Sequence, residues 1–217
     1  MVTMDEVRIA VNGMKKSKAI GPDGIPVEVW KLLKVDGWML LALFFNKFLR
    51  EEAILDEWCN NSLVPIFKNK GDLLECNYYR GIKLMAHTMK AWEKVIERRL
   101  REESEISQNH FGFMTGRGTT DAIFAIFQLY EKYRGAHKNL HMVFVDLEKA
   151  YDRVPREVLW WALNEKGVPG KYVQLIRAMY SRCSTQVRST AGTNSSFNVA
   201  VGLHQWSSLS PLFLMII

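Results

Sequence analysis

Asp146 is the side chain whose setting points most directly to chemistry. It lies near the end of the run His141–Leu147, which is rich in apolar and β-branched residues, so the sequence predicts a central β-strand that carries an acid near its end. A carboxylate in such a place is costly to bury unless it is paired or bound to a metal ion. Two interpretations of Asp146 therefore stand side by side, a metal ligand and a capped carboxylate at a strand end.

The composition sets the size and the class of the protein. The 217 residues are 48% apolar and 12% aromatic, which is enough for one domain of ordinary size or for two small lobes that share a core. A disordered tail is excluded on the same ground. The 29 Lys and Arg against 23 Asp and Glu give a formal charge of +6. This charge is compatible with a polyanionic partner, and an ordinary solvated basic surface accounts for it equally well.

Cysteine usage and hydropathy bear on the compartment. Cys59, Cys76 and Cys183 are far apart and form neither a zinc-binding spacing nor a disulfide framework, which favours a reducing intracellular setting. The sequence lacks the run of about 18 apolar residues that a membrane-spanning helix needs, and Met1–Glu6 does not resemble a signal peptide. We therefore expect an intracellular protein without a membrane partner.

The C-terminal run Pro211–Ile217 contains no polar residue. An apolar end of this kind needs to be covered by a partner or by sequence that follows it. We therefore expect a domain that is truncated at this point.

Capping signals and helical periodicity predict most of the helices. Thr3 and Glu6 fit a capping box at the start of the first helix. Gly37 is expected to separate a helix that begins at Pro26 from an apolar helix over 38–49. Further helices are predicted over 86–103, over 122–133, from Pro155 to Gly167, and from Pro169 to about residue 180.

Strand signals predict a small sheet. Ser62–Phe67 is rich in strand-forming residues, and Pro65 within it indicates an edge or bulged strand. A second strand at Arg80–Leu84 can pair back onto it after a turn. The segments 185–190 and 197–201 read as a hairpin. Together these elements predict an α+β fold with helices packed on a small antiparallel sheet.

A family resemblance is carried by six segments in a fixed order. Phe144–Asp152 resembles motif A of the reverse transcriptases of non-LTR retrotransposons, the long interspersed elements, and is most like the RTE type. Five further segments resemble motifs of the same family and extend the resemblance over nearly the whole chain: Gly21–Pro26, Val64–Lys68, Tyr79–Leu84, Phe111–Ala122 and Gly202–Leu212.

The resemblance implies a right-hand polymerase. Residues 1–135 would be a fingers-like region with N-terminal helices, and residues 136–217 a partial palm, truncated within motif B. The family uses two Mg²⁺ ions for nucleotidyl transfer, with an RNA template, a DNA primer and dNTP as substrates. The resemblance implies that Asp146 is the catalytic carboxylate, and that Asp146 and the carbonyl of Leu147 are ligands of Mg²⁺, which prefers oxygen.

The resemblance also assigns residues to the incoming nucleotide. Tyr151 would be the steric gate that excludes a ribose 2′-hydroxyl, Arg80 and Lys68 would hold the triphosphate, and Gln205 would contact the sugar or base. Leu147 belongs to the same nucleotide-binding group. Without the resemblance, Tyr151 reads as a core aromatic and Lys68 as a solvated turn residue.

The template is assigned to a glycine-rich loop. Gly116, Arg117 and Gly118 would lie against the template backbone, where a cation next to flexible glycines meets the phosphates.

Three departures from the family pattern affect the expected activity. The sequence contains no pair of adjacent aspartates, which the family carries on a later hairpin of the palm. Trp206 stands where the family has glycine after the glutamine, and Thr115 stands where proline is expected. A single carboxylate would hold two Mg²⁺ ions poorly. The missing palm hairpin and thumb predict a polymerase fragment that is inactive as it stands.

Two alternatives remain beside the inactive polymerase fragment. A non-catalytic remnant could still bind RNA or DNA through its cations, and a decayed element could have no selected function. The parent family works on chromosomal DNA, so the resemblance implies the nucleus.

Overall fold

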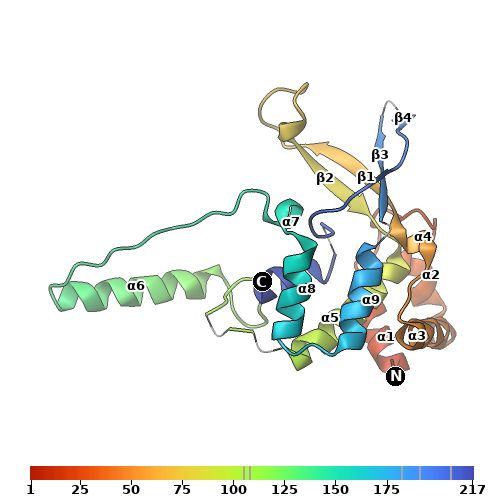
Figure 1. Cartoon of the computed structure of the whole chain (residues 1–217), viewed down its shortest axis with the longest axis horizontal. Coiled ribbons are helices and arrows are strands. Elements are labelled where there is room, and N and C mark those ends of the chain that lie inside the picture. Colours follow the sequence, from red (N-terminus) through yellow and green to blue (C-terminus); the bar gives the residue numbers. More distant parts are fainter. Residues whose placement is uncertain (105, 108, 182, 191, 206) are drawn as a thin grey trace.

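Most of the helices pack together below a small sheet that projects from them (Figure 1). A computed structural model describes residues 1–104, 106–107, 109–181, 183–190, 192–205 and 207–217. The α-helices of this part are α1 (Met4–Asn12), α2 (Val27–Leu32), α3 (Lys34–Glu51), α4 (Asp56–Cys59), α5 (His87–Glu103), α6 (Thr119–Gly135), α7 (Ala150–Arg153), α8 (Arg156–Glu165), α9 (Gly170–Tyr180) and α10 (Ser210–Ile216). The strands are β1 (Asn60–Phe67), β2 (Tyr79–Leu84), β3 (Ser184–Ser189), β4 (Gly192–Thr193) and β5 (Phe197–Asn198), and a 3₁₀ turn, η1 (Cys76–Tyr78), precedes β2.

The sheet has the order β2-β1-β3-β4, and β5 pairs with β3. β1 and β2 are antiparallel, from Ser62 opposite Leu84 to Phe67 opposite Tyr79, as the sequence predicts. β3 and β5 also pair antiparallel, which confirms the second hairpin. β1 and β3 run parallel, however. The α+β class is confirmed, and the sheet is mixed rather than wholly antiparallel.

Pro65 explains how β1 is both an interior and an edge strand. β1 pairs with β3 from Asn60 to Leu63 and with β2 from Ser62 to Phe67, so it lies between two neighbours only at Ser62 and Leu63. From Val64 onward β2 is its only partner among the described strands, and Pro65 lies opposite Gly81 there. The prediction of an edge strand is therefore wrong at Ser62 and Leu63 and right from Val64 to Phe67. Proline has no N–H to donate to a neighbouring strand. It is tolerated at this position because no strand pairs with β1 on the side away from β2 among the described residues.

Helix α5 is the centre of the hydrophobic core. Met89, Trp92, Ile96 and Leu100 on one face of α5 are fully buried, which confirms the predicted apolar stripe. The indole of Trp92 packs on the ring of Phe45 from α3, with ring centroids 5.1 Å apart. The core holds residues from both sides of position 135, and the division into 1–135 and 136–217 stays a prediction.

The N-terminal helix is fixed to this core by its predicted cap and by an ion pair. Thr3 and Glu6 form the capping box. Arg99 on α5 donates from Nε to Oε1 of Glu6 at 2.6 Å. Burial alone would raise the pKa of Glu6, but the hydrogen bonds and charge of Arg99, together with the Thr3 backbone N–H, lower that pKa to about 2.

Gly37 does not break the helix as predicted. The interruption lies at Leu33, between α2 and α3, and Gly37 lies inside α3. A Cβ atom at Gly37 would come within 2.7 Å of the Leu33 Cβ. This glycine is therefore explained by the close approach of the α2–α3 connection.

The apolar C-terminal run does not need an outside partner to cover it. It forms α10, whose Leu212 and Phe213 are fully buried in the core of the same chain. The ring of Phe213 packs against Tyr180 of α9, with centroids 6.4 Å apart. The expectation that a partner or following sequence must cover this run is wrong, because the core of the same chain buries most of it, while the truncation stays a prediction.

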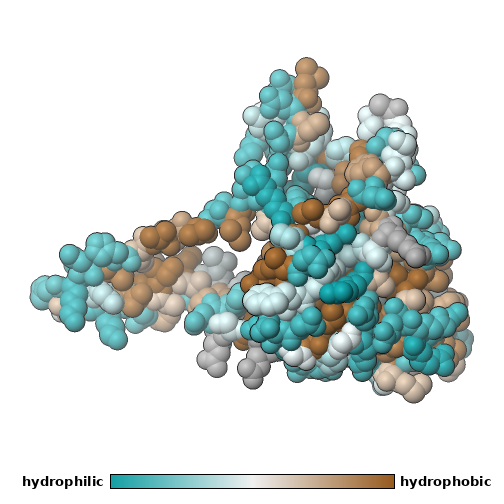
Figure 2. Space-filling model, viewed as in Figure 1, coloured by the Kyte–Doolittle hydropathy of each residue, from teal (hydrophilic) through white to brown (hydrophobic). Residues whose placement is uncertain are grey.

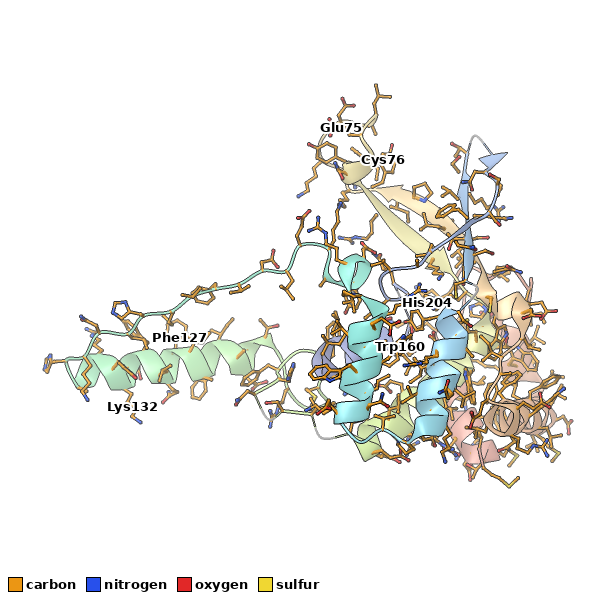
Figure 3. The ribbon with its side chains drawn as sticks, viewed as in Figure 1. Glu75, Cys76, Phe127, Lys132, Trp160 and His204 are labelled. Atoms are coloured by element: carbon orange, nitrogen blue, oxygen red, sulfur yellow. The ribbon has the colours of Figure 1, made fainter. Side chains whose placement is uncertain are left out.

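An arm projects from the body of the molecule (Figure 1). It consists of α6, which contributes no buried residue, and of the extended segment 138–149 that returns beside it. Phe127 and Lys132 mark the arm in Figure 3. Apolar residues colour much of its surface in Figure 2. None of the helices in the described part of the chain is long and apolar enough to cross a membrane.

Candidate nucleotide-binding site

A pocket of about 660 Å³ opens between β2, α7 and the start of α10. We call it the β2–α7 pocket and define it by its polar lining residues: Lys68, Arg80, Lys149, Tyr151, Asp152 and Gln205. Four of these were assigned to the incoming nucleotide from the sequence, namely Lys68, Arg80, Tyr151 and Gln205. Residues from distant parts of the sequence therefore meet in one cavity, and their roles stay predictions.

Three cations give the pocket a positive rim. Lys68 follows β1 and donates from Nζ to the carbonyl oxygen of Asn77 at 2.9 Å. Lys149 also lines the pocket and donates from Nζ to Oδ1 of the same Asn77 at 3.3 Å. Arg80 on β2 is exposed, and within the described residues its guanidinium forms no ion pair. A rim of this kind attracts an anion with several oxygens, because guanidinium and ammonium groups donate charge-assisted hydrogen bonds.

Tyr151 forms the wall of the pocket next to the core. Its side chain is half-buried and packs against the core cluster, and burial raises the pKa of its phenol. Its backbone carbonyl accepts a hydrogen bond from the Leu203 N–H at 2.7 Å. A neutral, well-fixed ring limits the room available to a ligand on that side.

Gly202 allows the loop at 202–205 to contact α7 and the residue that follows it. Its φ of +84° lies in the left-handed region, and a Cβ atom there would come within 2.7 Å of the Asp152 carbonyl oxygen. Its N–H donates to the carbonyl oxygen of Val154 at 3.0 Å. Only glycine allows the 202–205 loop to lie this close to α7.

A second, larger cavity adjoins the β2–α7 pocket. It has a volume of about 1060 Å³ and lies between the β1–β2 pair and the segments around β3 and β5. The two cavities share Tyr79, Gly81, Asp152 and Gln205 in their walls. Together they form a continuous groove.

Asp146 and Leu147 lie outside this groove. Both are exposed on the extended segment of the arm, and neither lines either cavity. The prediction of a central strand over His141–Leu147 is wrong, since Val143 and Phe144 are 87% and 79% exposed and the segment forms no strand. Apolar, β-branched residues favour an extended backbone, but a strand also needs a neighbour, and the five strands of the sheet pair with one another.

The three residues assigned to the template do not line the pocket, although Phe113 of the same segment does. Gly116, Arg117 and Gly118 precede α6 and line neither of the two cavities. The Arg117 guanidinium lies over the ring of Phe111, 5.9 Å from its centroid. The structure brings this loop to the base of the arm, and its contact with a template stays a prediction.

Comparison with known proteins decides the family. The family model described as "Reverse transcriptase (RNA-dependent DNA polymerase)" matches residues 67–217. The chain belongs to the reverse transcriptase family. The predicted kinship with retrotransposon reverse transcriptases is confirmed, while the RTE type and a truncation point stay predictions.

Several relatives of this reverse transcriptase chain come from mobile elements. It is 25% identical over 215 residues to "Probable RNA-directed DNA polymerase from transposon BS" of Drosophila melanogaster, covering 97% of the chain and 24% of that protein. It is 27% identical over 220 residues to "RNA-directed DNA polymerase from mobile element jockey" of Drosophila funebris, covering 97% and 23%. It is 25% identical over 214 residues to "Transposon TX1 uncharacterized 149 kDa protein" of Xenopus laevis, covering 96% and 16%. The chain thus spans a quarter or less of the length of these relatives.

Reverse transcriptases use a divalent metal, and the described part of this fold does not bring a set of acidic ligands for it together. Asp146 does not line the pocket, and Glu148 forms an exposed ion pair with Arg153 at 3.2 Å. Among the residues that the structure describes, there is no group of three or more His, Cys, Asp or Glu side chains placed to hold a metal ion. The donor set therefore does not fit a two-metal centre as folded here.

Sequence reasoning missed two polar residues of the β2–α7 pocket. Lys149 adds the third cation, and Asp152 accepts a hydrogen bond from Gln205. Both stand in the segment that resembles motif A, so their place in the motif was the available signal. Trp206, noted as a departure from the family, lies outside the described residues.

Proposed function

We propose that this chain is part of a retrotransposon RNA-directed DNA polymerase, and that the β2–α7 pocket binds the triphosphate of an incoming dNTP. One observation carries the proposal. Lys68, Arg80 and Lys149 surround the same pocket that has Tyr151 and Gln205 in its wall. This is a phosphate-binding rim next to a ring and an amide suited to a sugar and a base.

Each residue has a separate task in this proposal. Arg80 donates paired N–H bonds to phosphate oxygens, and Lys68 and Lys149, which both contact Asn77, supply point charges. The fixed ring of Tyr151 occupies the space that a 2′-hydroxyl would need. Gln205, held by Asp152, contacts the sugar or the base.

Nucleotidyl transfer needs more than this pocket. We propose that transfer requires Asp146 and further carboxylates to gather around Mg²⁺ beside the triphosphate. In the present fold Asp146 is exposed on the arm. We therefore expect the chain to bind dNTP and not to incorporate it.

The exposed arm is where the remainder of the polymerase would pack. Its extended segment presents Val143, Phe144 and Val145 to solvent, each more than three-quarters exposed. An extended apolar segment without a ladder partner is a site for an additional strand. We propose that palm strands of the whole polymerase pair with it, and this pairing would bring Asp146 into a sheet.

The binding of dNTP is tested by calorimetric titration of the chain with dATP. Saturable one-to-one binding is expected, and Arg80→Ala should weaken it about tenfold or more, equivalent to about 1.4 kcal/mol. Arg98→Ala is the matched control, because Arg98 is exposed on α5, pairs with Glu102 at 3.5 Å and does not line the β2–α7 pocket. Binding that Arg80→Ala leaves unchanged would contradict the proposal.

Catalysis is tested by primer extension on an RNA template with Mg²⁺ and dNTPs. No incorporation is expected from the chain alone. Incorporation that disappears in Asp146→Ala would show that the catalytic centre forms without further sequence, and would overturn this part of the proposal.

A second candidate function is non-catalytic binding of RNA or DNA. The observation that favours it is the separation of the phosphate-binding cations from Asp146. Such binding should fall steeply with salt and show little sequence preference. Absence of binding to single-stranded RNA, single-stranded DNA and a hybrid duplex at low salt would remove this candidate. An origin in an RTE-type element and a nuclear location stay predictions.

A further inference from the structure

We propose that Cys59 and Cys183 form a peroxide-reactive dithiol site that closes to a disulfide between the starts of β1 and β3. The site lies away from the β2–α7 pocket and does not depend on the function proposed above. Its substrate class is a small hydroperoxide. The observations are the register of two strands, the burial of both thiols and a histidine at the reactive sulfur.

The parallel register of β1 and β3 brings the two cysteines together. The ladder begins with Asn60 opposite Ser184, and each cysteine is the residue immediately before that pair. The hydroxyl of Ser184 donates to Oδ1 of Asn60 at 2.7 Å and fixes the two starts side by side. Neighbouring strands lie about 4.8 Å apart, which is within the Cα separation of about 4.4 to 6.8 Å that a disulfide spans.

Both thiols lie in the interior and contact one another. Cys59 is the last residue of α4 and Cys183 immediately precedes β3, and a side-chain hydrogen bond joins Cys59 to Cys183. Asn61 and Thr185 are opposite one another and both are buried. Cys59 and Cys183 are buried as well, and both are thiols in this structure.

Histidine and cationic groups surround the Cys183 sulfur. Nε2 of His204 lies 3.6 Å from Cys183 Sγ, and in the resting thiol Sγ donates to the Met179 carbonyl oxygen at 2.9 Å. A hydrogen bond from the Cys59 thiol lowers the pKa of Cys183, while burial of the sulfur opposes this shift. His204 and the charge of Lys83 lower the pKa of Cys183 further. The Arg156 guanidinium is a further charge that faces Cys183.

A neutral imidazole, that of His204, lies beside the Cys183 sulfur. Its ring is buried beneath the sheet and stacks on Tyr180, with centroids 4.2 Å apart (Figure 3). Burial, together with the charge of Lys83, lowers the pKa of His204 to about 4, so the imidazole is neutral at pH 7. Its Nδ1 has no hydrogen-bond partner among the described residues. A neutral imidazole 3.6 Å from the sulfur can take up its proton.

A cavity gives a small oxidant a route to Cys183. Cys183 lines a cavity of about 430 Å³, together with Trp160, Arg177 and Ser181. Cys76, by contrast, is exposed and lies beside β2. If exposure alone set the rate of oxidation, Cys76 would react first. Faster oxidation of Cys183 would therefore show that its surroundings, and not its exposure, make it reactive.

The reaction balances with one peroxide per chain. His204 takes the Cys183 proton, and the thiolate attacks one oxygen of hydrogen peroxide, breaks the O–O bond and forms a sulfenic acid; the leaving hydroxide recovers the proton as water. The Cys59 sulfur then attacks the sulfenic sulfur, and the departing hydroxide takes the Cys59 proton as a second water. Two thiols are oxidised by two electrons, and the peroxide is reduced to two waters.

The test treats the whole chain with one equivalent of hydrogen peroxide, then alkylates it and maps its peptides. A single cross-linked pair of peptides containing Cys59 and Cys183 is expected, unchanged in the control Cys76→Ser. A disulfide that includes Cys76, one that joins two chains, or oxidation of Cys76 ahead of Cys183 would overturn the proposal. The peptide map of the wild-type chain alone distinguishes these outcomes, even where a variant fails to fold.

Three variants separate the steps. Cys59→Ser should stop at the Cys183 sulfenic acid, which dimedone traps, and Cys183→Ser should form neither product. His204→Gln should slow peroxide consumption about tenfold or more, because the thiolate fraction falls. Circular dichroism confirms that each variant retains its helices. A His204→Gln variant that is folded and reacts at the wild-type rate would contradict the role given to His204.

Discussion

Gln205 and Asp152 join the two sides of the β2–α7 pocket. Nε2 of Gln205 donates to Oδ1 of Asp152 at 2.6 Å, which links the loop before α10 to the end of α7. Both side chains also line the adjoining larger cavity. The hydrogen bond therefore lies at the junction of the groove, where a bound nucleotide would cross from one cavity to the other.

Gln205→Glu should weaken dATP binding more than Gln205→Ala does. Both changes remove the donated hydrogen bond, but only the first places a carboxylate opposite Asp152 and near the triphosphate. We expect a loss of about tenfold or more for Gln205→Glu and a smaller loss for Gln205→Ala, measured by calorimetric titration. Equal losses would show that charge at this position does not matter.

Tyr151→Ala should reduce discrimination between dATP and ATP. If the ring excludes a 2′-hydroxyl, its removal opens that space, whereas Tyr151→Phe keeps the ring and removes only the phenolic oxygen. The ratio of the two dissociation constants should approach one in Tyr151→Ala and stay at its wild-type value in Tyr151→Phe. An unchanged ratio in Tyr151→Ala would refute the steric-gate assignment.

Gly202→Ala should disturb both the pocket and the fold. The added Cβ would meet the Asp152 and Tyr151 carbonyl oxygens at 2.7 and 2.8 Å, in addition to the strain of a positive φ. Gly24→Ala is the matched control, because Gly24 also has a positive φ, of +67°, but has open space around its Cβ position.

The control isolates the backbone strain, which costs about 1 to 2 kcal/mol. Gly202→Ala should lower the free energy of unfolding by more than Gly24→Ala does, and only Gly202→Ala should weaken dATP binding. Urea denaturation and the same titration measure the two effects. Equal effects of the two substitutions would mean that the contact with α7 is unimportant.

Glu93→Gln should change how stability depends on pH. Burial raises the pKa of Glu93 to about 7, although hydrogen bonds from Ser207 and Ser208 and the charges of Lys83 and Lys90 oppose the rise. A raised pKa means that the folded state favours the protonated acid. The stability from this group is present below about pH 4.5 and is lost as the pH rises towards 7.

The measurement is the free energy of unfolding from urea titrations between about pH 5 and pH 8. The decline with rising pH should be shallower in Glu93→Gln than in the wild type. Glu103→Gln serves as the control, since Glu103 is exposed at the end of α5. If the slope is the same in all three proteins, Glu93 does not titrate as proposed.

Local signals in the sequence predicted the elements whose stability is mainly local. The capping box of Thr3 and Glu6, the apolar face of α5 and the β1–β2 pairing each depend on residues close together in the chain, and all are confirmed. The strand predicted over His141–Leu147 is absent for the opposite reason. Its composition favours a strand, but a strand requires a partner, and the described strands pair elsewhere.

The sequence predicted only those residues of the candidate site that belong to a recognisable motif. Lys68, Arg80, Tyr151 and Gln205 were assigned from the resemblance and lie in one pocket. Asp146 was assigned in the same way and lies outside that pocket. The meeting of Cys59 and Cys183 depends on the parallel pairing of β1 with β3, and no local pattern in the sequence indicates that pairing.

Hydrogen–deuterium exchange of the chain with and without dATP tests most directly whether the β2–α7 pocket binds the nucleotide. We predict slower exchange, on addition of dATP, in β2, in residues 149–154 and in residues 202–205, with no change in α6. Protection confined to α6 and residues 138–147, or no protection anywhere at a saturating dATP concentration, would contradict nucleotide binding in this pocket.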